Sequence, residues 1–365
     1  MARKKVLCVV GTRPEAVKVA PVILELRKRP DLFEPIVMST GQHRQILDQM
    51  MTTFDLKPDV DLDIMKANQT LTDVTVRVLS AMHDYLVSNK PDVVLAQGDT
   101  TTVMAASVAC FYTHVPFGHI EAGLRTGDRW SPFPEEFNRR VAALVARYHF
   151  APTQESADNL LPEGIDPKTI HVTGNTVIDA LKYVVGRTQP PPKPVPDGAQ
   201  YILMTCHRRE IFGQKVVEVF QTVRDFSRAH RDVYVWYPVH PNPNVSKPAR
   251  EILGNEPNVV LTEPLDYVTF LHAMNGAYLM LSDSGGVQEE APSLGKPVLV
   301  LRDVTERPEG VAAGTCELVG PHRQKIEAAL HRLFNDKAEY ARMSGARNPY
   351  GDGHASQRIA EILMR

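Results

Sequence analysis

Short runs rich in valine, isoleucine and leucine alternate with longer amphipathic stretches along the whole chain, and this alternation constrains the fold more than any other feature. Apolar runs occupy residues 6–10, 35–40, 92–97 and 117–122 in the first half, and 201–206, 233–239, 259–264, 277–283 and 297–303 in the second. Uninterrupted apolar runs separated by helical stretches are typical of parallel strands buried on both faces. The sequence therefore predicts an α/β fold built on parallel sheets.

The alternation pauses once, in VTGNTVIDALKYVVGRTQPPPKPVPDG at residues 172–198. A cluster of prolines can neither continue a helix nor pair in a central strand, so a domain boundary is expected near it. The predicted division is an N-terminal domain of residues 1–171 plus 351–365 and a C-terminal domain of residues 172–350. Two Rossmann-like domains facing across a cleft are the expected architecture, with ligands at the carboxyl ends of the strands.

Charge and cysteine content exclude several classes of protein. The 41 basic and 43 acidic residues give a formal net charge of −2, so nothing general favours nucleic acid or an anionic membrane as a partner. No apolar stretch reaches the roughly 20 residues that span a bilayer. The four cysteines lie far apart without a CxxC pair, which disfavours a zinc ribbon or a disulfide framework. The sequence predicts a cytoplasmic globular protein without a metal site.

The stretch GTRPEAVK, residues 11–18, follows the first apolar run directly. Thr12 and Glu15 have the spacing of a capping box, and Pro14 suits the first helical turn. Arg13 is different, because a cation is unfavourable at the positive end of a helix dipole unless an anion joins it. Lys18 lies one turn further on. We interpret Arg13 and Lys18 as ligands of an anion, such as a phosphate.

A second candidate phosphate site follows the run at 277–283. Ser284, Gly285 and Gly286 open a helical stretch, where backbone N–H groups can approach a diphosphate without a Cβ in the way. Glu290 stands further along this helix, where it could accept the hydroxyls of a ribose, and Arg307 follows the next strand. The patterns GxGxxG and GxxxxGK[ST] are absent at these positions, which disfavours a dinucleotide or kinase-type loop.

Three acids lie where the first-half strands end. Asp99 and Glu121 end neighbouring strands, and Glu135 lies in the following WSPFPEEFNRR segment. Each could be a helix cap, but carboxylates converging on an anion site are repulsive unless they handle protons or sugar hydroxyls. His207 and Arg208-Arg209 add cations from the second half. Cys206 fits a small residue at a strand end better than a thiol nucleophile.

The chain is similar to the non-hydrolysing UDP-N-acetylglucosamine 2-epimerases, which have a glycosyltransferase-B type fold. The resemblance covers nearly the whole chain and is carried by GTRPEAVKVAP, GDTTT, HIEAGLRTGD, WSPFPEEFNRR, HRRE, DSGGVQEEAPSLGKPVLVLRDVTERPEG and NPYGDGHAS. It implies interconversion of UDP-N-acetylglucosamine and UDP-N-acetylmannosamine without metal or other cofactor. UDP leaves to give 2-acetamidoglucal and then adds back, and the product is a precursor of bacterial surface polysaccharide. A homodimer is also implied.

The resemblance further implies roles for individual residues. The catalytic set is Asp99, Glu121, Glu135 and His207, with His207 also beside UDP. The UDP-binding set is Arg13, Lys18, Phe270 near the uracil, Ser284, Gly285, Gly286, Glu290 at the ribose and Arg307. An activating second UDP-N-acetylglucosamine would meet Gln42, Gln45, Arg208 and His240. Asn68 replaces an arginine of the family pattern, so weak activation is expected.

Three other interpretations stay open. A hydrolysing epimerase would share the UDP site but release free N-acetylmannosamine, although HIEAGLRTGD resembles the non-hydrolysing branch. A retaining glycosyltransferase of the same fold would need a groove for its acceptor. A sugar-nucleotide sensor without activity would not require three acids. The sequence does not tell which carboxylate removes the proton and which returns it.

Overall fold

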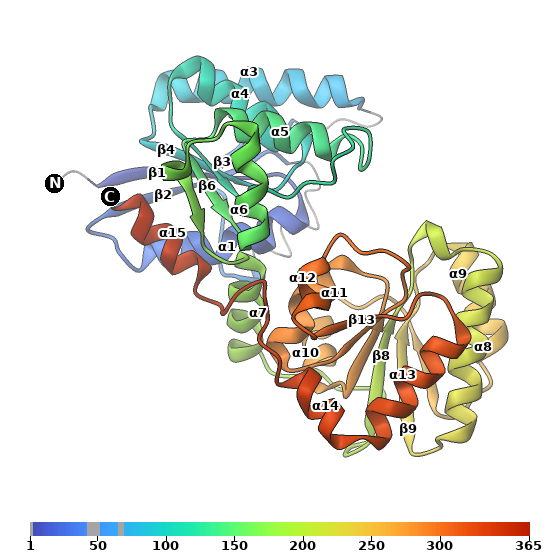
Figure 1. Cartoon of the computed structure of the whole chain (residues 1–365). Helices are drawn as coiled ribbons and strands as arrows, with labels where there is room; N and C mark the ends of the chain where they lie inside the picture. The colour runs from blue at the N-terminus through green and yellow to red at the C-terminus, as the bar shows by residue number, and fades with distance from the viewer. Residues whose placement is uncertain (1–2, 42–51, 65–68) are drawn as a thin grey trace. The chain divides into compact units, whose positions relative to one another are not determined.

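The chain folds into two compact units, shown in the computed structural model of Figure 1, which describes residues 3–41, 52–64 and 69–365. Unit 1 comprises Met1–Tyr183 and Gly351–Arg365, and unit 2 comprises Val184–Tyr350. The chain passes from unit 1 to unit 2 inside helix α7 (Thr176–Arg187), later than residue 171 where the sequence placed the boundary. It returns at residue 351, where the sequence placed the return.

Unit 1 is built on a parallel sheet with the strand order β3-β2-β1-β4-β5-β6-β7. Its strands are β1 (Lys4–Val10), β2 (Phe33–Ser39), β3 (Val60–Asp61), β4 (Val93–Gln97), β5 (Phe117–Ile120), β6 (Tyr148–Ala151) and β7 (Ile170–Val172). Its helices are α1 (Arg13–Arg27), α3 (Leu71–Asn89), α4 (Thr101–Thr113), α5 (Glu135–Val145), α6 (Gln154–Leu160), most of α7 and α15 (Ala355–Leu363), with the short turns η1 (Leu161–Glu163) and η2 (Pro167–Thr169).

Unit 2 has a second parallel sheet with the order β10-β9-β8-β11-β12-β13. Its strands are β8 (Gln200–Thr205), β9 (Val233–Pro238), β10 (Val259–Thr262), β11 (Leu279–Ser282), β12 (Val298–Val300) and β13 (Cys316–Leu318). Its helices are α8 (Gln214–Ala229), α9 (Pro243–Leu253), α10 (Tyr267–Gly276), α11 (Gly285–Glu290), α12 (Pro308–Ala312), α13 (Arg323–Asn335) and α14 (Lys337–Ser344), with η3 (Arg209–Ile211) and η4 (Ala291–Leu294).

Helices cover both faces of each sheet, as the apolar runs predict. In unit 1, α4 packs between α3 and α5 on one face, while α1 packs with α15 on the other (Figure 1). In unit 2, α8 packs between α9 and α13. The central strands are fully apolar inside: residues 6–10 of β1 are each 0–1% exposed. The α/β class with parallel sheets is thus confirmed.

The C-terminal helix α15 is fastened to unit 1 at both ends. The carboxylate of Asp179 accepts hydrogen bonds from the backbone N–H groups of Ala355 and Ser356, at 3.2 and 2.8 Å, and so caps the helix. Burial raises the pKa of Asp179, and the two N–H donors partly offset the cost of that burial. At the other end Lys4 donates to the carbonyl of Leu363 at 2.5 Å. The tail therefore completes the fold of unit 1.

Candidate active site

The turn between β1 and α1 has the predicted capping box. The Thr12 hydroxyl accepts from the N–H of Glu15, and the Glu15 carboxylate accepts from the N–H groups of Gly11 and Thr12 at 2.6 and 2.8 Å. The Thr100 hydroxyl, at the start of α4, also donates to Glu15. Burial raises the pKa of Glu15. Arg13 is the first residue of α1 and lies at the helix N-terminus.

Glu121 sits at the end of β5, inside a set of hydrogen-bond donors. Its carboxylate is 2.6 Å from Lys18 Nζ and 3.1 Å from Asn175 Nδ2, and it also accepts from Gln97 Nε2. Glu121 is only 8% exposed, and its backbone is left-handed with φ +66°. Glu121 is thus held in place by one cation and two amide donors.

Asp99 follows β4 and is held from helix α5. Arg139 Nη2 forms an ion pair with Asp99 Oδ2, and Asn138 Nδ2 donates to the Asp99 backbone carbonyl at 2.9 Å. Arg139 is itself held by Glu136, which is fully buried, at 3.3 Å. The β4 and β5 strands pair directly, so the ends that carry Asp99 and Glu121 are neighbours at one edge of the sheet.

Glu135 is the first residue of α5 and is half-buried. Within the described part of the chain, no hydrogen bond or ion pair joins it to Asp99 or Glu121. The three acids therefore have different surroundings: Asp99 and Glu121 are each paired with a cation, and Glu135 is at a helix N-terminus.

A buried histidine connects the ends of β4 and β5. His119 Nε2 donates to the carbonyl of Gly98 at 2.7 Å, and its side chain is fully buried. Burial lowers the pKa of His119 to about 4. The ring therefore stays neutral at physiological pH and fixes the backbone directly before Asp99.

In unit 2, His207 lies at the end of β8 beside a buried acid. Asp283, which follows β11 and is fully buried, accepts from the backbone N–H groups of His207 and Arg208 at 2.6 and 2.7 Å. His207 Nδ1 is 3.0 Å from Asp283 Oδ1, within ion-pair range although not aligned as a hydrogen bond. The His207 ring also stacks on His240, with ring centres 5.7 Å apart. Asp283 thus holds the backbone at His207 and lies beside its imidazole.

The Ser284-Gly285-Gly286 turn opens helix α11. The Ser284 side chain does not cap the helix, and both glycines lie outside the positive-φ region. A Cβ on Gly285 or Gly286 would meet nothing closer than 3.8 Å. Glycine at such a helical position is about 1 kcal/mol less favourable than alanine. The fold of this unit therefore does not need glycine at these two positions. Glycine would instead allow a ligand to approach the backbone closely.

The other residues predicted to bind UDP in this unit lie before and after this turn in the sequence. Glu290, the last residue of α11, is 8% exposed. Arg307, directly before α12, forms an ion pair with Glu289, which is buried. Phe270 is half-buried on α10. Glu289 therefore fixes the position of Arg307, a contact that its place in the sequence does not reveal.

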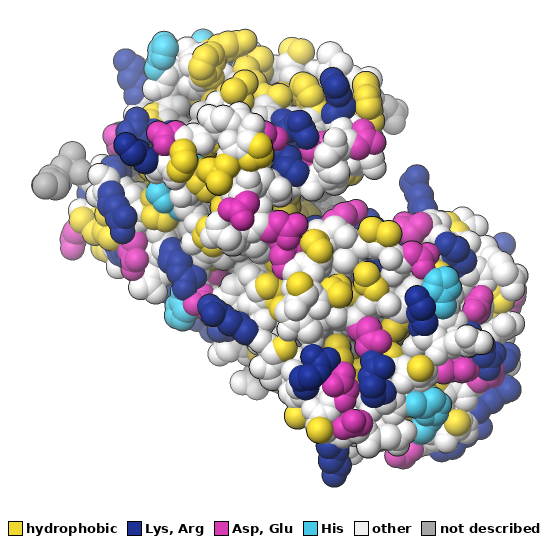
Figure 2. Space-filling model, viewed as in Figure 1, with side chains coloured by type: hydrophobic (Ala, Val, Ile, Leu, Met, Phe, Trp, Pro, Cys, Tyr) yellow, Lys and Arg dark blue, Asp and Glu magenta, His cyan; other side chains and the backbone are white. Residues whose placement is uncertain are grey.

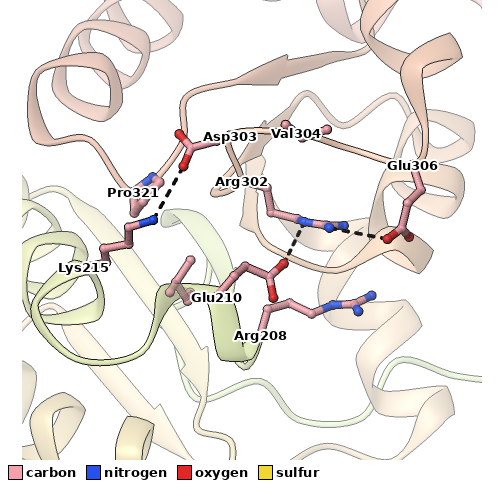
Figure 3. Close-up of a pocket in the computed structure, with 9 residues that line it drawn as sticks. Arg208, Glu210, Lys215, Arg302, Asp303, Val304, Glu306 and Pro321 are labelled. Carbon is pink, nitrogen blue, oxygen red and sulfur yellow. Dashed lines mark ion pairs between the residues drawn. The ribbon is translucent and has the colours of Figure 1, made fainter. Parts of the chain in front are cut away.

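A cavity of about 400 Å³ opens at the carboxyl ends of β8 and β12 (Figure 3). Its lining includes Arg208, Glu210, Lys215, Arg302, Asp303 and Glu306. Arg302 is 3.0 Å from Glu210 and 3.5 Å from Glu306, whereas Lys215 is 3.7 Å from Asp303. Basic and acidic groups alternate around the cavity, and Arg208 extends into it from the segment after β8.

Cys206 is unsuited to act as a nucleophile. Its side chain is 1% exposed, and burial raises the pKa of the thiol well above its usual value. The thiolate is the reactive form, so an inert thiol is expected.

Some predicted residues and features fall outside these contacts. Gln42, Gln45 and Asn68 lie outside the described residues. Among residues 3–41, 52–64 and 69–365, no group of three histidine, cysteine, aspartate or glutamate side chains could hold a metal ion. No helix in the same ranges is long and apolar enough to cross a membrane.

Sequence reasoning missed the residues that hold the predicted acids and cations. These are Gln97, Arg139, Asn175, Asp283 and Glu289. Gln97 and Asp283 stand at strand ends, as Asp99 and Glu121 do, and that position is a signal that could have found them. Arg139 and Asn175 carry no such signal, because their contacts depend on how α5 and the segment before α7 pack.

Comparison with known proteins gives matches over nearly the whole chain. The family model described as UDP-N-acetylglucosamine 2-epimerase matches residues 24–364. The UDP-N-acetylglucosamine 2-epimerase of Salmonella typhimurium is 52% identical, with 98% of each chain covered. A glycosyltransferase of kitacinnamycin at 14% identity and TM-score 0.70, covering 100% and 99% of the two chains, shows the shared fold alone.

Two solved structures carry ligands. The UDP-N-acetylglucosamine 2-epimerase of Neisseria meningitidis, bound to UDP-N-acetylglucosamine, has 47% identity and a TM-score of 0.87, with 99% of each chain covered. The enzyme of Methanocaldococcus jannaschii, in complex with UDP-N-acetylglucosamine and UDP, has 32% identity and a TM-score of 0.77, with 98% and 99% covered. The chain described here belongs to the UDP-N-acetylglucosamine 2-epimerase family.

Proposed function

We propose that the protein is a non-hydrolysing epimerase that interconverts UDP-N-acetylglucosamine and UDP-N-acetylmannosamine. The observation that carries the proposal is the placement of Asp99 and Glu121 at the ends of the paired strands β4 and β5, each held by a cation. Fixed carboxylates at this edge are suited to proton transfer at a sugar carbon. The product would be an activated sugar for bacterial surface polysaccharide.

The proposed reaction is an elimination followed by re-addition. A carboxylate removes the proton on carbon 2, the C2–H electron pair forms the C1=C2 bond of 2-acetamidoglucal, and the C1–O pair leaves with UDP. UDP then adds back to carbon 1 while carbon 2 receives a proton on the opposite face. The proton on carbon 2 is not acidic, so its removal must be coupled to loss of a well-stabilised diphosphate. Asp99, Glu121 and Glu135 form the proposed acid–base group.

We assign binding of UDP mainly to unit 2. The N–H groups at Gly285 and Gly286 and the Ser284 hydroxyl would hold the diphosphate, with Arg307 supplying charge. Glu290 would accept the ribose hydroxyls, and Phe270 would lie near the uracil. His207, which lies beside Asp283, would stabilise the charge that develops on the leaving diphosphate. Arg13 at the N-terminus of α1 is proposed as a further diphosphate ligand.

Lys18 has two proposed roles. Its ion pair with Glu121 at 2.6 Å assigns it to the acid–base group as well as to the diphosphate. A lysine ammonium has three donors, so one can remain on Glu121 while another meets an anion.

The hydrolysing alternative differs in its products. A hydrolysing enzyme would give UDP and free N-acetylmannosamine, whereas the proposed enzyme keeps the sugar joined to UDP. Incubation with UDP-N-acetylglucosamine, followed by ¹H and ³¹P NMR, is expected to show UDP-N-acetylmannosamine at equilibrium with the substrate. Free N-acetylmannosamine accumulating in step with UDP would establish the hydrolysing reaction, and unchanged substrate would favour the sensor.

A second nucleotide-sugar site is also proposed. Arg208 lines the cavity of Figure 3, and His240 stacks on His207. Arg208 follows His207 in the chain, and His240 contacts the His207 ring. A ligand bound to Arg208 and His240 could therefore shift the position of His207. The Methanocaldococcus jannaschii enzyme was solved with two different ligands, UDP-N-acetylglucosamine and UDP.

The proposed assembly is a homodimer formed through unit 1. Exposed apolar side chains gather on α3, α4 and α5: Val76, Val87, Phe111, Tyr112, Phe137 and Leu144 are 52–80% exposed. Figure 2 shows hydrophobic side chains over this part of the surface. Contiguous exposed apolar patches mark interaction sites.

The dimer can be tested by a charge placed on this patch. Leu144 is 80% exposed on α5 and is expected to be buried in the dimer. Leu144→Glu should therefore convert the dimer to monomers, as measured by sedimentation velocity. Leu32→Glu, at an exposed apolar residue of unit 1 outside these helices, is the matched control and should remain dimeric. A monomeric wild type, or a dimer unaffected by Leu144→Glu, would contradict the proposed interface.

A further inference from the structure

Helix α5 buries polar residues where an ordinary amphipathic helix would bury apolar ones. Glu136, Asn138 and Arg139 are 0, 2 and 8% exposed. Burying charged side chains is costly, and a buried ion pair is often no more stable than apolar residues of similar volume. Stability of the fold alone therefore does not account for these three residues.

Two of them, Asn138 and Arg139, contact Asp99, and the third, Glu136, supports Arg139. The Glu136 carboxylate accepts hydrogen bonds from Arg139 Nη1 at 3.3 Å and from the backbone N–H of Thr126 at 3.2 Å. These bonds hold Glu136 in place beside Arg139. Arg139 then presents Nη2 to Asp99 Oδ2. Asn138 holds the backbone carbonyl of the same aspartate at 2.9 Å. Asp99 is thus fixed at its backbone and at one carboxylate oxygen from a single helix.

The second carboxylate oxygen of Asp99, Oδ1, has different surroundings. Within the part of the chain that the structure describes, no side chain or backbone group donates a hydrogen bond to Asp99 Oδ1. The Asp99 side chain also remains 27% exposed. One oxygen is therefore held and the other is left to face a ligand, which is the geometry that a proton-transferring carboxylate needs.

We propose that Arg139, supported by Glu136, is a positioning residue that fixes Asp99 for proton transfer in the reaction. This inference rests on the proposed function. Arg139 would act through Asp99 and would not touch the substrate. A displaced carboxylate transfers a proton poorly even when the substrate still binds, because catalysis is sensitive to misplacement of about 1 Å.

The test compares Arg139→Met with Arg139→Lys and with a matched control, Arg140→Met. Arg140 is on the same helix and pairs with the same Glu136 at 3.0 Å, but it has no contact with Asp99. We expect Arg139→Met to lower kcat about 10-fold or more. KM and the affinity for UDP by calorimetry should stay within about 2-fold, because in this proposal Arg139 acts through Asp99 and not on the ligand. Arg139→Lys should recover most of kcat, and Arg140→Met should match the wild type.

A double-mutant cycle separates positioning from general structural damage. In the Asp99→Asn background, Arg139→Met should lower kcat by less than about 2-fold further, because both changes disable the same group. An equal loss of kcat in both backgrounds, or wild-type kcat in Arg139→Met, would overturn the proposal. If Arg139→Met does not fold, Arg139→Gln takes its place with the same thresholds. A wild-type protein without epimerase activity would refute the proposed function instead, so the two failures are distinguishable.

Discussion

Asp99→Asn is expected to lower kcat about 100-fold or more while leaving the affinity for UDP nearly unchanged, because general acid–base groups act in the transition state. Asparagine keeps the shape of the side chain but cannot take up or release the proton. Glu121→Gln and Glu135→Gln should have effects of similar size for the same reason. Turnover is measured by NMR with UDP-N-acetylglucosamine, and UDP affinity is measured by calorimetry.

A control variant guards against a general effect of lost charge. Asp158 is exposed on α6, where it accepts from Gln154 at 2.8 Å, so Asp158→Asn should keep normal turnover. Near-normal turnover in all three carboxylate variants would show that the proposed acid–base group is wrong.

Loss of helix α15 should unfold unit 1 or leave it marginally stable. Ile359 and Leu363 are 0 and 1% exposed, and full burial of such a side chain contributes about 1.5–3 kcal/mol. Removing residues 355–365 should therefore lower the free energy of unfolding by about 3–6 kcal/mol, out of the roughly 5–15 kcal/mol typical of folded domains. Urea unfolding followed by circular dichroism measures the loss.

A point variant gives the same test in a chain of full length. Ile359→Ala should cost about 2–5 kcal/mol. Gln357→Ala, at an exposed position on the same helix, should change the free energy of unfolding by less than about 0.5 kcal/mol. Equal stability of the Ile359→Ala variant and the wild type would mean that α15 does not complete the fold of unit 1.

The fold was largely predictable because it depends on local patterns. Buried parallel strands must be apolar on both faces, so runs such as residues 6–10 and 201–206 stand out in the sequence. The capping box at Thr12 and Glu15 is confirmed because its two hydrogen bonds lie within one turn of helix. The passage between the units was harder to place, since it lies inside α7, which begins at Thr176, after residue 171, and runs to Arg187 before the proline-rich segment.

The surroundings of the candidate site were less predictable because they depend on long-range packing. The stretch GTRPEAVK predicts that Lys18 is a phosphate ligand, yet Lys18 forms an ion pair with Glu121, more than a hundred positions later. The Asp99–Arg139 pair likewise joins two segments 40 residues apart. Sequence patterns place each residue at the end of a strand or on a helix, but they do not tell which two ends meet.

The most direct test of the proposed function follows the hydrogen on carbon 2. The protein is incubated with UDP-N-acetylglucosamine in deuterated water, and the carbon-2 proton of the product is followed by ¹H NMR and mass spectrometry. The proposed reaction removes the original proton from carbon 2 and adds a hydrogen from solvent. The product is therefore expected to be UDP-N-acetylmannosamine carrying deuterium at carbon 2. UDP-N-acetylmannosamine that forms with its original proton still on carbon 2 would contradict this account.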